Sequence, residues 1–165
     1  MSEAGAAGTP PQAAGADENA LPQFGVLAQY VRDLSFENPN APASLTAGRA
    51  PAIEVGVDVR ARPLGEDRYE IELKLGATAR HDDRVAFVVE LVYAGLFAIR
   101  NVPQESMQAV CLIEGPRMLF PFARRVLADA TRDGGFPPLL LDPIDFVALF
   151  RQSQEQNRGP APAAN

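Results

Sequence analysis

The hydrophobic period of this chain changes once, and that change constrains the possible fold more than any other feature. Between Phe24 and about Ile99, apolar and polar residues alternate with a period of two, whereas from Glu105 onward apolar residues recur at helical spacing. A period of two is typical of strands with one buried face, and spacings of three and four are typical of amphipathic helices. The sequence therefore predicts strands first and helices second, which is the α+β class.

Short turns separate the predicted strands, with no helical segment between them. Turn-forming residues occupy 64–67 and 80–83, and a segment rich in Pro, Asn and Ala, residues 38–51, connects the first strand to the second. Connections of this kind predict an antiparallel meander with one crossover loop. The four predicted strands are residues 24–37, 53–60, 69–75 and 85–93.

Two helices are expected after the strands. The long one covers about 104–133 and ends at Gly134, and the Gly115-Pro116 pair inside it predicts a break or kink. The short one is expected to begin with Asp142 as its N-cap. The predicted fold is a four-stranded antiparallel sheet with a long kinked helix and a short C-terminal helix on one face.

The two ends of the chain differ in composition from the middle. Residues 1–20 and 152–165 are rich in Ala, Gly, Pro or Gln and hold almost no large apolar side chains. Such segments cannot bury enough surface to offset the entropy of ordering them. The sequence predicts a disordered N-terminal arm over 1–20, one folded domain over 21–151 and a flexible tail over 152–165. No apolar run has the length or flanking charges of a membrane helix or a secretory signal.

Charge and cysteine content exclude several classes of function. The net charge is -6, with -3 in residues 1–20, -4 in 21–150 and +1 in 151–165, which argues against nucleic acid or anionic lipid as a partner. One cysteine, Cys111, and one histidine, His81, cannot form an intramolecular disulfide or a Cys/His zinc site. We therefore expect no metal, no cofactor and a reducing compartment, the cytoplasm.

The sequence does not support an enzyme. It contains no phosphate-binding glycine loop, no GxSxG elbow and no HExxH motif. His81 beside Asp82 and Asp83 could form an acid/base or metal cluster, but a solvated turn is the better interpretation. Cys111 lies at a core-facing helical position, where packing is more common than nucleophilic catalysis. A small hydrolase that uses His81 stays open as an alternative.

Apolar surface exceeds what one small domain can easily bury. The segment 85–93 is apolar on both faces of its predicted strand, and 144–150 is apolar nearly all round its predicted helix. Excess of this kind indicates subunit contacts or a surface for apolar ligands. An oligomeric adaptor or structural protein that binds one folded partner is a second alternative.

Several sequence blocks resemble one known family. Residues 33–42 read DLSFENPNAP and closely resemble the DxSFExPNAP signature of the bacterial protein-export chaperone SecB. Further blocks agree in order and spacing, and the resemblance covers roughly residues 24–151. These blocks are FVVE at 87–90, AGLF at 94–97, LFPFAR at 119–124, GFPPL at 135–139 and PIDFVALF at 143–150.

The resemblance implies a function and an assembly. SecB is a cytosolic, ATP-independent holdase that binds unfolded secretory precursors, keeps them competent for translocation and passes them to the motor ATPase SecA. It is a homotetramer, a dimer of dimers with the long helices sandwiched between two sheets. It has no cofactor, and it neither binds nucleic acid nor inserts into the membrane.

The resemblance also implies positions for two binding surfaces. Carried over residue by residue, the SecA-binding patch falls on Asp33, Glu37, Val88 and Glu90. The client groove falls between the crossover loop, the second strand and the last helix. Its expected residues are Leu45, Ile53, Val55, Val57, Phe146, Leu149 and Phe150.

Overall fold

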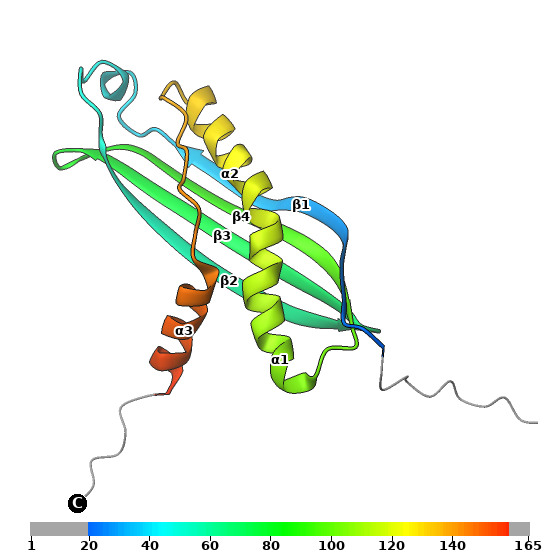
Figure 1. Cartoon of the computed structure of the whole chain (residues 1–165). Coiled ribbons are helices and arrows are strands. Elements are labelled where there is room, and N and C mark those ends of the chain that lie inside the picture. The colour runs from blue at the N-terminus through cyan, green and yellow to red at the C-terminus, as the bar shows by residue number, and fades with distance from the viewer. Residues whose placement is uncertain (1–19, 159–165) are drawn as a thin grey trace, which may run out of the picture.

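The computed structural model describes residues 20–158 and confirms the predicted α+β class. One antiparallel sheet holds all four strands in the order β1-β4-β3-β2, and helices cover one of its faces (Figure 1). The strands are β1 (Gln23–Glu37), β2 (Ala52–Gly65), β3 (Arg68–His81) and β4 (Arg84–Arg100). The helices are η1 (Ala43–Leu45), α1 (Gln104–Ala109), the π-helical turn η2 (Val110–Glu114), α2 (Gly115–Asp133) and α3 (Phe146–Asn157).

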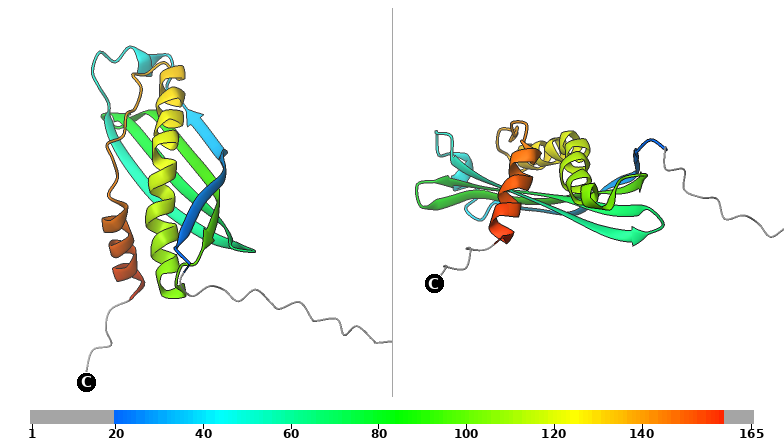
Figure 2. Two further views of the ribbon diagram at one scale, coloured as in Figure 1. Left: turned by 45° about the vertical axis from the view of Figure 1, so that its right-hand side comes forward. Right: turned by 60° about the horizontal axis from the view of Figure 1, so that its bottom comes forward.

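The sheet has two chemically different faces, as its alternating sequence predicts. Ile71, Leu73 and Leu75 of β3 point toward the helices and are fully buried. Their neighbours Glu72 and Lys74 point to the opposite side. We call the helix-covered side the inner face and the opposite side the outer face; the right-hand view of Figure 2 shows the helices gathered on the inner face.

The long helix runs without a break from α1 through η2 into α2. In place of the break or kink predicted at Gly115-Pro116, the helix has a π-helical turn. Pro116 sits in the first turn of α2, and a π-helical turn comes directly before Gly115. Proline has no N–H to donate to the preceding turn, and the wider turn accommodates that loss. A Cβ at Gly115 would overlap Ile71, so this glycine lets the helix approach the sheet closely.

The last helix starts later and ends later than the sequence predicted. Its N-cap is Asp145, whose Oδ1 accepts a hydrogen bond from the Ala148 N–H at 3.0 Å, so the prediction of Asp142 was wrong. Residues 137–145, before this helix, form no regular element, and the segment is tied to α2 by the Leu139 N–H, which donates to Thr131 Oγ1 at 2.9 Å.

The predicted C-terminal tail was placed too early. Helix α3 continues to Asn157, six residues into the segment predicted to be a tail, and Gln154 donates a hydrogen bond to Gln108 of α1 at 3.2 Å. This side-chain contact with the long helix favours the extra turns. The rest of the predicted tail, 159–165, and nearly all of the predicted arm, 1–19, lie outside the described residues.

A buried carboxylate ties three strands together on the outer face. Glu70 of β3 is 6% exposed and accepts hydrogen bonds from Tyr30 of β1 at 2.7 Å and Arg62 of β2 at 3.0 Å. Arg32 of β1 pairs with the same carboxylate and with Glu72. The hydrogen bond from Arg62, aided by Tyr30 and Arg32, lowers the pKa of Glu70 to about 2 even though burial alone would raise it.

The low pKa of Glu70 predicts a loss of stability in acid. The folded pKa lies below the ordinary value of 4.5, so the network stabilises the fold above about pH 4.5 and this contribution disappears as the pH falls toward 2. We expect Glu70→Gln to lower the free energy of unfolding at pH 7 by about 1–3 kcal/mol, because the neutral amide loses the charge-assisted hydrogen bonds that the buried carboxylate accepts from Tyr30 and Arg62. Urea unfolding at pH 7 and pH 3 measures this. The exposed Glu155→Gln is the control, and equal stability of the two variants at pH 7 would contradict the account.

Candidate functional site

The four residues of the predicted SecA-binding patch lie together on the outer face. In the β1–β4 register Glu37 is opposite Val88, Ser35 is opposite Glu90, and Asp33 is opposite Val92. The patch requires β1 to be adjacent to β4, and the sheet order provides this contact. We call Asp33, Glu37, Val88 and Glu90 the outer acidic patch.

The carboxylates of the outer acidic patch are in water. The Glu90 side chain is 54% exposed, and its nearest cation is the Lys74 Nζ at 4.0 Å. No ion pair within residues 20–158 involves Asp33 or Glu37. The patch therefore presents negative charge around the partly exposed Val88, an arrangement that complements a basic surface with an apolar centre.

An apolar pocket lies where the crossover loop meets the segment after α2. This crossover pocket has a volume of about 430 Å³, and the predicted residues Leu45 and Ile53 form part of its wall. Both side chains are more than 40% exposed, so they offer apolar surface to a ligand. Sequence analysis missed the opposite wall, Phe136 to Leu140; the run GFPPLLL at 135–141, apolar but without helical spacing, was the available signal.

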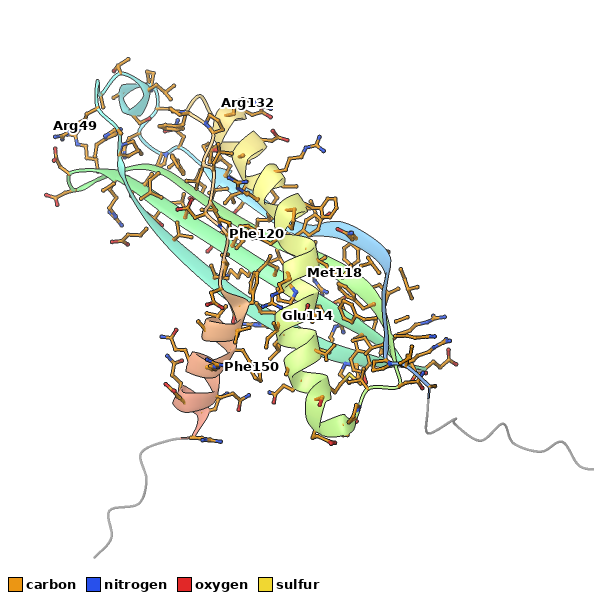
Figure 3. All side chains as sticks on the ribbon, viewed as in Figure 1. Arg49, Glu114, Met118, Phe120, Arg132 and Phe150 are labelled. Atoms are coloured by element: carbon orange, nitrogen blue, oxygen red, sulfur yellow. The ribbon has the colours of Figure 1, made fainter. Side chains whose placement is uncertain are left out.

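A second pocket lies between β2 and α3. This α3 pocket has a volume of about 280 Å³, and the predicted residues Val57, Leu149 and Phe150 line it together with Val59 and Leu112. Figure 3 shows Phe150 on α3, which lies beside the long helix. The three polar residues Gln152, Ser153 and Gln156 form its rim on the last helix, so the α3 pocket is more polar than the crossover pocket.

Two predicted groove residues have different environments. Val55 lies on the inner face of β2 between the two pockets; it is 47% exposed because no helix covers it. Phe146 is only 2% exposed and packs edge-on against Phe120 with ring centroids 6.2 Å apart. As the first residue of α3 it faces the long helix, so the structure places it in the core rather than on the groove surface.

The other residues considered for chemistry have structural surroundings. Cys111 is buried, and burial raises the pKa of its thiol to about 11, so it is a poor nucleophile at neutral pH. His81 ends β3 and lines the crossover pocket beside the β3–β4 turn. The described part of the chain holds no group of three His, Cys, Asp or Glu side chains placed to bind a metal ion.

These features are typical of a protein that binds polypeptides. The apolar crossover pocket and the polar-rimmed α3 pocket lie on the same side of β2, which among residues 20–158 pairs with β3 alone and so is an edge of the sheet. Exposed valine and isoleucine side chains connect them along that strand. Such a surface suits an extended polypeptide with apolar side chains. Among residues 20–158, no helix is long and apolar enough to span a membrane.

Comparison with known proteins agrees with this class. The family model described as preprotein translocase subunit SecB matches residues 17–157. The protein-export protein SecB of Xanthobacter autotrophicus is 54% identical over 146 residues, which cover 88% of this chain and 94% of that protein. The protein of the same name from Zymomonas mobilis is 55% identical over 144 residues, covering 87% and 88%.

A solved structure shares the fold. The SecB-like chaperone Rv1957 of Mycobacterium tuberculosis, in complex with a ChAD peptide from the antitoxin HigA1, superposes with a TM-score of 0.63 at 13% identity, over 73% of this chain and 90% of that one. The chain belongs to the SecB family, which confirms the resemblance drawn from its motifs. This family is not a class of enzymes.

Proposed function

We propose that this chain is an ATP-independent holdase that binds unfolded secretory preproteins, keeps them translocation-competent and delivers them to SecA. The observation that carries the proposal is the pair of pockets that place exposed aliphatic and phenylalanine side chains along the edge strand β2 in a member of the SecB family. The match to proteins named for protein export, which extends over most of the chain, supports the client class.

The chemistry of the two pockets suits unfolded clients of many sequences. Aliphatic and phenylalanine side chains contribute affinity in proportion to apolar area, about 25 cal/mol per Å², without requiring particular hydrogen bonds. The free edge of β2 adds backbone donors and acceptors that any extended segment can pair with. Binding of this kind needs no nucleotide and no cofactor, because it stabilises the unfolded client by mass action.

The outer acidic patch supports delivery to a basic partner on the other side of the sheet. Each exposed charge pair contributes only about 0.2–1 kcal/mol, so the patch acts collectively. We propose that SecA is this partner and that Val88 provides an apolar contact at its centre. Since the pockets open on the inner face and the patch on the outer face, client and SecA bind at the same time.

Exposed apolar side chains support self-association. Met118 and Phe122 of α2 are 42% and 50% exposed, and Val31 and Leu34 on the inner face of β1 are exposed to a similar degree. The strand β1 is also an edge of the sheet. We propose a cytoplasmic homotetramer, a dimer of dimers, in which copies of the chain cover these residues; neither nucleic acid nor membrane insertion is part of the function.

Mass measurement tests the assembly. We expect light scattering at micromolar concentration to give four times the chain mass, and Phe122→Asp to shift the protein toward smaller species because a buried charge at an interface is strongly unfavourable. A monomer mass for the unchanged protein would contradict the proposed tetramer.

A charge in the α3 pocket tests client binding. We expect Phe150→Asp to weaken the suppression of aggregation of several unrelated unfolded proteins without ATP, while light scattering still gives the tetramer. Leu64→Asp, an exposed apolar position at the end of β2 outside both pockets, is the control. Suppression confined to one folded partner would instead favour the adaptor alternative, and unchanged suppression by Phe150→Asp would remove that residue from the client site.

Charge reversal in the patch tests the delivery step. We expect Glu90→Lys to lose SecA binding and still prevent client aggregation, because patch and pockets are on opposite faces of the sheet. In the unchanged protein, binding should weaken as salt rises, given a Debye length of about 10 Å at 0.1 M. Titration calorimetry with SecA and a light-scattering aggregation assay measure the two activities. Loss of both, or of neither, would overturn the division of the surface.

A further inference from the structure

A hollow in the outer face shares Val88 and Glu90 with the outer acidic patch. It has a volume of about 350 Å³ and spans β2, β3 and β4. In the sheet register Gly56 is opposite Gly76, which is opposite Glu90; in the adjacent row Glu54 is opposite Thr78, which is opposite Val88. We call this feature the glycine hollow, because two glycines form the part of its floor between Glu54 and Glu90.

The backbone and the packing do not require these glycines. Neither Gly56 nor Gly76 has a positive φ, unlike Gly65 at the hairpin turn. A Cβ at Gly56 would have nothing within 4 Å, and at Gly76 it would meet only the Val89 carbonyl oxygen at an ordinary 3.9 Å. Glycine inside a strand weakens the strand and often marks a place where another molecule approaches closely. Two opposed glycines keep this part of the outer face free of side chains.

The charges around the glycine hollow select the kind of group that fits. Glu54 and Glu90 lie on two sides of it, and Glu37 lies in the same row as Val88. Within residues 20–158, Glu54 forms no ion pair, and Glu90 has only the loose contact with exposed Lys74 at 4.0 Å. An apolar group bound here would desolvate these carboxylates without pairing them, and an acidic group would be repelled.

We propose that the glycine hollow receives a basic side chain of SecA, so that Gly56, Gly76 and Glu54 extend the outer acidic patch into a specific socket. The apolar stem of a lysine or arginine lies across the two glycines and Val88, and its charged head reaches the Glu54 and Glu90 carboxylates. Long basic side chains bind in this way because they bury the stem and keep the charge at a polar rim. This inference rests on the proposed role of the outer face in binding SecA.

Filling the hollow tests the inference without disturbing the fold. We expect Gly76→Thr to keep or raise stability, since threonine favours strands and its Cβ has space, but to weaken SecA binding about tenfold or more by occupying the socket. Gly25→Thr is the matched control: it is also a strand glycine on the outer face with nothing within 4 Å, and its partner Ala98 lies at the far end of the sheet. Calorimetry with purified SecA, with urea unfolding of each variant, measures both properties.

The outcomes distinguish the proposed socket from the broader proposal that the outer acidic patch binds SecA. Weak SecA binding by Gly76→Thr and by Glu54→Gln, with full binding by Gly25→Thr, supports the socket. Unchanged or tighter binding by Gly76→Thr, while Glu90→Lys loses binding, overturns the socket and leaves the outer acidic patch in place. If Gly76→Thr and Glu90→Lys both bind SecA fully, then the outer face is not the SecA site.

Discussion

The packing of the long helix against β3 and β4 determines where every functional surface can lie. Gly115 on the helix and Gly95 on β4 allow a close approach, since a Cβ at either would overlap neighbouring core side chains. The helix covers the inner face over β3 and β4, and it leaves the β2 residues Ile53 and Val55 uncovered. An edge strand with apolar side chains therefore remains beside two pockets, and no helix of residues 20–158 covers the outer face.

The two faces of the sheet differ in the physical basis of binding. The inner-face pockets offer aliphatic and phenylalanine side chains, whose contacts are non-directional and are not weakened by electrostatic screening. The outer face offers charge, which steers a partner and confers orientation but is screened. On the outer face, charge also stabilises the fold: the buried Glu70 carboxylate of β3 binds side chains of β1 and β2. A holdase that must release its client to a motor benefits from keeping the two kinds of contact on separate faces.

The sequence predicted the strands and the faces of their residues better than it predicted the surroundings of the groove residues. A period of two predicts that Asp33 shares a face with Glu37 on β1 and that Val88 shares a face with Glu90 on β4, and the register agrees. The adjacency of these two strands came from the family resemblance and not from the alternation. The groove depends on tertiary contacts that no local pattern contains. Phe146 has the same residue type as Phe150 and lies one helical turn away, yet only Phe146 is fully buried. Likewise, Asp142 has the sequence signals of an N-cap, but the side chain that accepts the capping hydrogen bond is that of Asp145, three residues later.

Amide hydrogen exchange of the complete chain, with and without a bound unfolded client, tests the central claim most directly. The account predicts that a client slows exchange along the free edge of β2 and in the segments that line the two pockets, residues 43–59 and 135–153. Exchange around Val88 and Glu90 on β4 should stay unchanged, because the outer face does not contact the client. Protection confined to the outer acidic patch, with none along β2, would contradict the account.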